Sequence, residues 1–405
     1  MTNLWPPAAV VFAVAAAVGM RFLPKLRGYQ FTAWIIAAVT AGMIYPAQFL
    51  RVGDFDLRSK WLILLIVQAV MFGMGTQMKL ADFRGVLKMP WAVAIGVGGQ
   101  FTIMPLVGYG LTKVFHFEPE IAAGIILIGS CSAGLASNVM AYIAKANLAL
   151  SITMTSVTTA LAPILTPLWM KLLAGELVDV KPFTMMMEII KMVIMPIGAA
   201  LLHDYLTSAS ERGRRMVWAA ALVGMSWLGF IGCGGWEWLK GLAAAEVLPW
   251  IGTVGYLWGA IIFGLLYHHA ARLLPKLEKL MPVLSMFGIV YFTTVTTAAG
   301  RDNLLQVGGL LFVAAALHNL LGYVFAYWLA RACKLDMASC RTVAFEVGLQ
   351  NGGMASGIAG ALGKLGTMGL AAAIFSPWMN ISGSILANYW RKRQPEETSS
   401  IANRQ

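Results

Sequence analysis

The sequence predicts an all-α membrane protein that crosses the bilayer many times, and three observations lead to this fold class. Of the 405 residues, 59% are hydrophobic and only 12% are charged, whereas a typical soluble domain has about 25% charged residues. Apolar stretches of about 20 residues, each long enough to cross a bilayer as a helix, recur along the chain. The basic residues behind the net charge of +12 cluster between these stretches, which is typical of membrane proteins and argues against nucleic-acid binding.

Hydropathy predicts about thirteen transmembrane helices with short connectors that leave no room for a separate soluble domain. The predicted spans cover residues 5–22, 31–49, 60–79, 90–112, 121–144, 148–173, 184–203, 216–235, 248–269, 279–299, 306–330, 341–364 and 367–390.

The charges in the connectors predict the orientation of the chain. When the connectors are counted alternately, one set holds most of the basic residues, including Arg212, Arg214 and Arg215 and the run Arg391–Arg393. The basic set should be cytoplasmic, which places the N-terminus outside and the C-terminus inside. The first span has no positively charged segment before it, so we expect a retained helix and not a signal peptide. The lack of a transit peptide and the short connectors predict a multi-pass protein of a bacterial inner (plasma) membrane.

Two of the predicted spans are interrupted by small and polar residues. The segment FEVGLQNGGMASG (345–357) places a carboxylate, two amides and several glycines in an apolar span, and GLASNVMAYIAKANLA, from Gly134, resembles GMASGIAGALGKLGTM, from Gly353. Close packing of helices explains the glycines but not the amides or the acid. The two segments are expected to enter the membrane in opposite directions, and interrupted helices in inverted halves indicate the binding site of a secondary transporter.

The polar residues of these interruptions are suited to binding a hard cation. A carboxylate inside the membrane needs a partner, and Glu346 has no Lys or Arg near it on its own helix except Arg341 at the cytoplasmic end. Sodium would be such a partner, and hard cations prefer oxygen ligands. The candidate ligands are Glu346, Gln350, Ser137, Asn138 and Thr155, with Ser151 on the same helix face as Thr155. Gln100 is a lone amide in its span, a type of residue that serves helix packing as often as ligand binding.

The interrupted segments resemble the bile acid:sodium symporter family. The resemblance rests on EVGLQNGGMA, on GLASNVMAYIAKANLALSITMTSV with QFTIMP, and on FSPWMNISGSILANYW, and it covers about residues 31–203 and 278–392. It implies a fold of ten helices in two inverted repeats of five, with two broken helices that cross. It also implies import of an organic anion, such as a bile acid or a small carboxylate, together with Na⁺, by alternating access.

The resemblance assigns the site residues by motif. It implies a first sodium site made of Ser137, Asn138, Ser151, Thr155 and Glu346, and a second made of Gln100, Glu346, Gln350 and the backbone carbonyls of Val347 and Leu349. Asn351 and Asn380 would face the substrate cavity. The sequence departs from the family pattern at Leu135, Gly352 and Met379, where relatives often have Thr, Ser and His. These departures make the cavity less polar and put a bile acid substrate in question.

The chain is longer than the family core, so we divide it into five parts. These are an extra N-terminal helix (1–30), the first repeat half plus the first helix of the second (31–203), an inserted helix pair (204–277), the remainder of the second half (278–392) and a disordered cytoplasmic tail (393–405). An added pair keeps the orientation of the helices that follow it, so the additions agree with the charge pattern.

Other functions remain as alternatives. Glu346 could exchange protons instead of binding Na⁺, and an arsenite-type efflux carrier of similar architecture is a related alternative, with Cys131 just before the first interruption. The sequence contains no HExxH, no paired aspartates and no GxSxG within a span, so an intramembrane enzyme is a distant alternative. The Cys and His residues form no transition-metal pattern. No ATP-binding motif is found, and the expected partners are a small organic anion and membrane lipid.

Overall fold

The computed structural model describes residues 5–23, 30–242 and 247–393 and confirms the all-α polytopic fold class. Within these ranges nine helices are long and apolar enough to cross a membrane, and a bent pair, Lys60–Gly75 with Leu80–Lys88, would make ten. Helical segments lie over each of the thirteen predicted spans. The total of thirteen crossings stays a prediction, because the helix Gln30–Ile44 and the halves of the two interrupted spans are shorter than a full crossing. The predicted tail lies outside the described residues, apart from Arg393.

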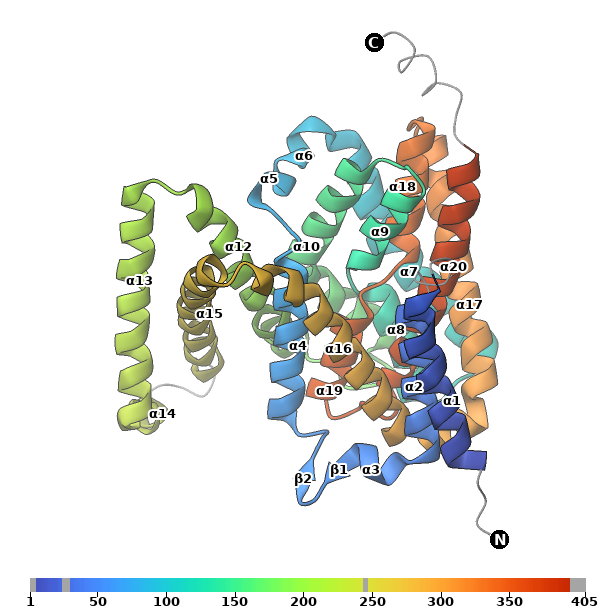
Figure 1. Ribbon diagram of the computed structural model, residues 1–405, viewed down its shortest axis with the longest axis horizontal. Helices are drawn as coiled ribbons and strands as arrows, with labels where there is room; N and C mark the ends of the chain where they lie inside the picture. Colours follow the sequence, from blue (N-terminus) through green and yellow to red (C-terminus); the bar gives the residue numbers. More distant parts are fainter. Residues whose placement is uncertain (1–4, 24–29, 243–246, 394–405) are drawn as a thin grey trace.

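The first part of the chain forms one side of the bundle and a short hairpin. Its elements are α1 (Trp5–Gly19), η1 (Met20–Phe22), α2 (Gln30–Ile44), α3 (Pro46–Leu50), β1 (Arg51–Val52), β2 (Phe55–Asp56), α4 (Lys60–Gly75), α5 (Leu80–Phe83) and α6 (Gly85–Lys88). The strands pair antiparallel. In Figure 1 this hairpin lies at the lower end of the molecule and α5 and α6 lie at the upper end. That separation agrees with the predicted alternation of connectors, while the side that faces the cytoplasm stays a prediction.

The remaining elements complete the bundle. They are α7 (Pro90–Phe115), α8 (Pro119–Ser130), α9 (Leu135–Ile143), α10 (Leu148–Ala174), α11 (Pro182–Ile189), the π-helical turn η3 (Ile190–Ile194), α12 (Met195–Ser208), α13 (Glu211–Phe230), η4 (Ile231–Gly235), α14 (Trp236–Leu242), α15 (Leu248–Leu273), α16 (Lys276–Ala299), α17 (Arg301–Ala332), α18 (Met337–Gly348), α19 (Gly352–Ala361) and α20 (Gly369–Lys392).

Local sequence signals explain where several helices begin. Proline occupies the first turn of α7, α8 and α11, where its missing N–H would have no intrahelical partner. Asn147, Ser210 and Asp336 each cap a helix with a side-chain oxygen that accepts a backbone N–H of the first turn.

Two helices are broken, and their breaks cross. α8 and α9 are separated by residues 131–134, and α18 and α19 by residues 349–351. Ala133 pairs with Gln350 in an antiparallel bridge, and the N–H of Asn351 donates to the carbonyl of Ser132 at 2.9 Å. The expectation of two broken, crossing helices is therefore confirmed, whereas the relation of the two halves by inverted symmetry stays a prediction.

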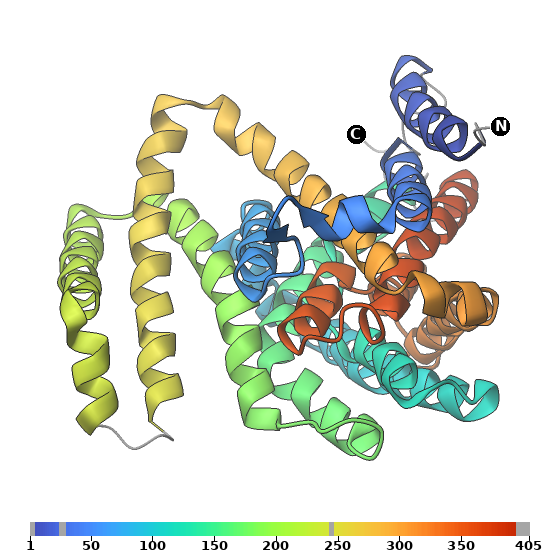
Figure 2. The same cartoon turned by 90° about the horizontal axis from the view of Figure 1, so that it is seen from below.

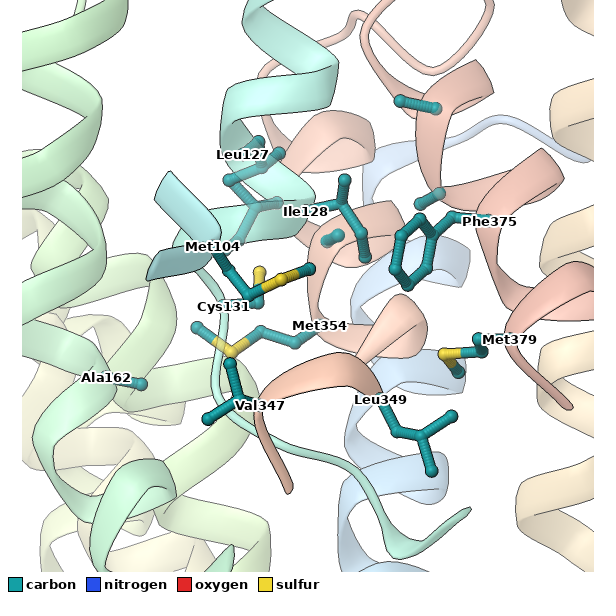
Figure 3. Packing of buried hydrophobic residues seen from close by; sticks show 14 of the residues in the cluster. Met104, Leu127, Ile128, Cys131, Ala162, Val347, Leu349, Met354, Phe375 and Met379 are labelled. Atoms are coloured by element: carbon teal, nitrogen blue, oxygen red, sulfur yellow. The ribbon is translucent and has the colours of Figure 1, made fainter. Parts of the chain in front are cut away.

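The crossing lies inside the main hydrophobic core. Cys131, Val347, Leu349 and Met354 are all completely buried, and Met104 packs beside them. Figure 3 shows these side chains gathered around the two breaks together with Phe375 and Met379 of α20. Close contacts of α8 with α7, α10 and α20 complete this packing. The apolar shell excludes water from the polar atoms of the breaks.

The helix pair α13 and α15 stands to one side of the bundle (Figures 1 and 2). α15 packs against α12 and α13. It reaches α4 through Phe72, whose ring lies edge-on to the rings of Phe263 and Tyr267 at centroid distances of 4.9 and 4.8 Å. α13 and α15 thus form an arm with limited contact to the crossing, and that this pair is an insertion into the family core stays a prediction.

The packing of α8 yields a stability prediction. A Cβ at Gly124 would lie 2.2 Å from the backbone carbonyl oxygen of Met368, which cannot move as a flexible side chain can. We expect Gly124→Ala to lower the free energy of unfolding by about 1–3 kcal/mol, as overpacking does. Gly198→Ala is the matched control, because a Cβ there meets no atom within 4 Å and alanine favours a helix. Thermal unfolding in detergent measures both, and equal midpoints for the two variants would contradict the prediction.

Candidate ion-binding site at the helix crossing

Glu346 lies in the last turn of α18, directly before the break, and is completely buried. Its Oε1 accepts a hydrogen bond from Ser151 at 2.5 Å and its Oε2 accepts one from Thr155 at 2.9 Å. Ser137 lies near the carboxylate, while its hydroxyl donates to the backbone carbonyl of Gly134 at 2.7 Å. Within the described residues, no Lys, Arg or His forms a salt bridge with Glu346, although a buried carboxylate needs a partner. Arg341, the nearest basic residue along α18, bonds instead to the carbonyls of Trp390 and Arg393.

The oxygen atoms around Glu346 outnumber the hydroxyl hydrogens that could form hydrogen bonds between them. Ser151 Oγ lies 2.8 Å from Asn138 Oδ1 as well as 2.5 Å from the carboxylate, and Thr155 Oγ1 lies 3.3 Å from the same Asn138 oxygen. Each hydroxyl has one hydrogen and can satisfy only one of its two oxygen neighbours. The cluster joins α9, α10 and α18, and its excess of hard oxygen atoms suits a cation such as Na⁺. The five residues of the predicted first site are thus brought together.

A second polar group lies at the crossing itself. Gln100 of α7 donates through Nε2 to the carbonyl of Cys131 and to Gln350 Oε1, both at 2.9 Å. Gln350 donates in turn to the carbonyl of Val347 at 2.6 Å. Gln100 Oε1 is buried and has no hydrogen-bond partner among the described residues. An orphaned amide oxygen beside backbone carbonyls is an acceptor that a cation could use.

Hydrogen bonds therefore join three residues of the second predicted site, Gln100, Gln350 and Val347. Leu349 is completely buried and its N–H continues α18 by donating to Phe345. Its carbonyl as an ion ligand stays a prediction.

The predicted substrate residues lie around the break and on α20. Asn351 is 5% exposed and caps α19 by accepting the N–H of Met354 at 3.0 Å. Met379 is buried and faces the crossing in Figure 3. Leu135 and Asn380 are partly buried, and Asn380 donates to Ser376 on its own helix. Their contact with a substrate stays a prediction.

α20 packs closely against Gly352, where the resemblance to the family leads us to expect serine. A Cβ at Gly352 would lie 1.9 Å from Ser376 Oγ. Serine at position 352 would collide with this hydroxyl unless Ser376 moved, so the glycine accompanies the approach of α20 to the first turn of α19.

Sequence reasoning missed a polar network behind the second break. Asn319 of α17 is completely buried and donates to the carbonyl of Gly348 at 2.8 Å, while its own oxygen accepts from Ser382 at 2.5 Å. Tyr323 contacts Ser382 at 3.3 Å. The carbonyl of Gly348 lost its helical donor where α18 ends, and Asn319 replaces that donor. An isolated amide in a long apolar span was the only signal in the sequence.

A pair of opposite charges within a span was also overlooked. Glu188 and Lys191 form an ion pair at 2.5 Å, and both side chains are largely buried. Lys191 lies in η3 and its ammonium sits 5.7 Å from the ring centroid of Tyr256 on α15. The signal was a Glu and a Lys at i,i+3 in an apolar span. This pair ties the arm to the bundle and does not reach the cluster around Glu346 by any hydrogen bond among the described contacts.

Fold and site together define the class of protein. A polytopic α-helical bundle with two crossing broken helices, surplus oxygen ligands and a buried carboxylate that has no basic partner among the described residues is the arrangement of an ion-coupled membrane transporter.

Comparison with known proteins identifies the family. A sequence model described as the sodium bile acid symporter family matches residues 62–235. An uncharacterized sodium-dependent transporter of Bacillus subtilis, YocS, is 32% identical over 92% of this chain and 94% of its own length. A probable chloroplast sodium/metabolite cotransporter of Arabidopsis thaliana, BASS1, is 26% identical over 93% of this chain and 77% of its own, and the human ileal sodium/bile acid cotransporter is 26% identical over 71% and 65%. The chain belongs to the sodium bile acid symporter family, whose named relatives are sodium-coupled transporters and not enzymes.

The network behind the second break gives a test of its role. Asn319→Leu keeps the approximate shape but leaves the carbonyl of Gly348 without its donor, so we expect a loss of about 1–3 kcal/mol in the free energy of unfolding. Asn388→Leu is the control, because Asn388 donates only to Ser384 on its own helix. Denaturation monitored in detergent compares them. A control that is destabilised as much as Asn319→Leu would refute a specific role for the network.

Proposed function

We propose that this protein imports a small organic anion by binding two Na⁺ ions at the helix crossing and alternating between outward-open and inward-open states. The observation that carries the proposal is the environment of Glu346: a completely buried carboxylate, no basic partner among the described residues, and oxygen ligands drawn from three helices. Cotransported Na⁺ would supply the missing positive charge.

The first ion would bind Ser137, Asn138, Ser151, Thr155 and Glu346. These residues come from α9, α10 and α18, so the ion would tie both broken helices to α10. In its presence the two hydroxyls could turn their oxygens to the ion and release hydrogen bonds that now compete. The second ion would lie between Gln100, Glu346, Gln350 and the carbonyls of Val347 and Leu349. The unpartnered Gln100 oxygen supports this position.

The anion would bind next to the same crossing. The N-termini of the half-helices α9 and α19 both begin there, and the positive ends of helix dipoles favour negative charge. Asn351 and Asn380 would offer amide donors, and Leu135 and Met379 would make the cavity apolar. The names of the relatives mention bile acids and metabolites, so an amphipathic or small carboxylate is the substrate class we propose. The membrane would be a bacterial inner membrane, with the N-terminus outside.

Coupling follows from shared atoms. Gln350 is at once a proposed ion ligand and the partner of Ala133 in the bridge between the breaks. Binding of Na⁺ would fix the two breaks relative to each other and so complete the anion site. Without the ions, the carboxylate of Glu346 would disfavour the closed crossing.

Thermal stability in matched NaCl and KCl tests the ion sites directly. Sodium at 100 times its Kd should raise the free energy of unfolding by about 2.7 kcal/mol. The wild type should unfold at a higher temperature in NaCl, and Glu346→Ala should lose this difference. Glu118→Ala removes an exposed glutamate at the start of α8 and should keep it. Identical curves in both salts for the wild type would remove the main support for sodium coupling, and uptake driven by a pH gradient without sodium would then test protons at Glu346.

Charge movement tests the stoichiometry. Two Na⁺ carried with one monovalent anion move one net positive charge, which is worth about 2.3 kcal/mol per 100 mV. In proteoliposomes that hold this protein, uptake should be accompanied by inward current and should rise with an inside-negative potential. Electroneutral uptake of a monovalent anion would contradict the proposed ratio while leaving sodium dependence itself intact.

A further inference from the structure

A groove of about 800 Å³ lies beside the contact of α15 with α12, between the arm formed by α13 and α15 and the helices α4 and α16. Its walls come mainly from α4, α12, α15 and α16, and its side chains are almost all apolar, with Gln68, Tyr256 and Tyr267 carrying the polar groups. On α15, Gly252 and Gly259 meet no atom within 4 Å of an added Cβ, and Gly255 meets only Trp227 at 3.9 Å. The glycines therefore widen a space that the described residues do not fill.

The groove lies between helices expected to span the bilayer, so its occupant is apolar along most of its length. α15 and α16, which form one wall, are both long and apolar enough to cross a membrane. Water in this space would find few hydrogen-bond partners. A hydrocarbon chain matches the lining.

One end of the groove carries positive charge. Ala270 and Leu277 line this end, and Arg272, Lys276 and Lys279 stand next to them in the sequence, all exposed. In the part of the chain that the structure describes, none of the three forms a salt bridge. The acid among them, Glu278, is directed to His203, with Oε1 3.4 Å from Nε2. A second basic cluster at the start of α13 includes Arg214. The charges of Arg214 and Arg272 both influence His268 of α15 electrostatically, so the two basic groups lie near the same end of α15.

We propose that this groove is a binding site for an anionic phospholipid. Its acyl chains would lie along the glycines of α15, and its phosphate would meet Arg272, Lys276 and Lys279. Basic pockets between transmembrane helices are the sites where anionic headgroups bind. The lipid would complete the packing between the arm and α4 and α16, where the protein provides only part of the contact.

Native mass spectrometry of the full chain, titrated with phosphatidylglycerol or with phosphatidylcholine of the same acyl chains, tests this site. The wild type should bind phosphatidylglycerol more tightly. Arg272→Gln with Lys279→Gln should weaken phosphatidylglycerol about tenfold and phosphatidylcholine little, because basic side chains attract the anionic headgroup. Arg84→Gln with Lys88→Gln removes the same charge from exposed residues at α5 and α6 and should bind like the wild type.

A second variant tests the apolar part of the site. Gly255→Leu with Gly259→Leu fills the groove and should weaken both lipids, and an unchanged sodium-dependent unfolding temperature would show that the variant is folded. Equal binding of the two lipids by the wild type, or equal loss in the rim and control variants, would overturn the proposal. A wild type that dimerises and a groove variant that does not would also overturn it, in favour of a second copy of the chain as the occupant.

Discussion

The burial of the Glu346 carboxylate is the constraint on which the arrangement of the central helices depends. An acidic side chain inside a membrane-spanning bundle costs about 2.5–3.5 kcal/mol on insertion scales unless its charge is compensated. The protein surrounds this group with hydroxyl and amide groups from α9 and α10 and no basic residue among those described. A lysine would have neutralised the site permanently. Oxygen ligands alone leave the charge to be balanced by something that can arrive and leave.

The need to compensate buried polar groups also applies to the broken ends of the helices. Where α8 and α18 stop, backbone carbonyls lose their helical donors, and in a membrane such groups must be satisfied within the protein. Side chains from other helices replace those donors: Thr166 bonds the carbonyl of Ser130, Gln100 that of Cys131, and Asn319 that of Gly348. The two breaks then bond each other through the bridge of Ala133 and Gln350. Because these donors belong to helices that surround the crossing, a shift of the breaks would require those helices to exchange hydrogen bonds together.

The contrast between Glu346 and Asn319 explains how much the sequence could predict. Glu346, Gln350 and the Ser/Thr pair on α10 stand out because polar residues are rare in apolar spans and because their spacing and the family motif point to one site. Asn319 and Thr166 are equally polar, but their partners are backbone carbonyls more than 25 residues away. A backbone carbonyl has no residue type, so no pattern in the sequence identifies it. The broken helices, by contrast, were predictable, because the breaks are marked by Gly, Asn and Gln, which are residue types that the sequence shows directly.

The arm is the part of the molecule that sequence reasoning described least well, and the reason is physical. Hydropathy predicts that residues 216–235 and 248–269 are helices but not how closely they approach the bundle. Their approach is set by the close packing of α15 on α12. The rings of Phe72, Phe263 and Tyr267 and the ammonium of Lys191 on Tyr256 add contacts to α4 and η3. Between these contacts the glycines of α15 leave open space. α4 lines this space and also packs against α19, so a molecule that fills the space would contact a helix that touches the crossing. The arm is therefore placed to influence the site without contributing a ligand to it.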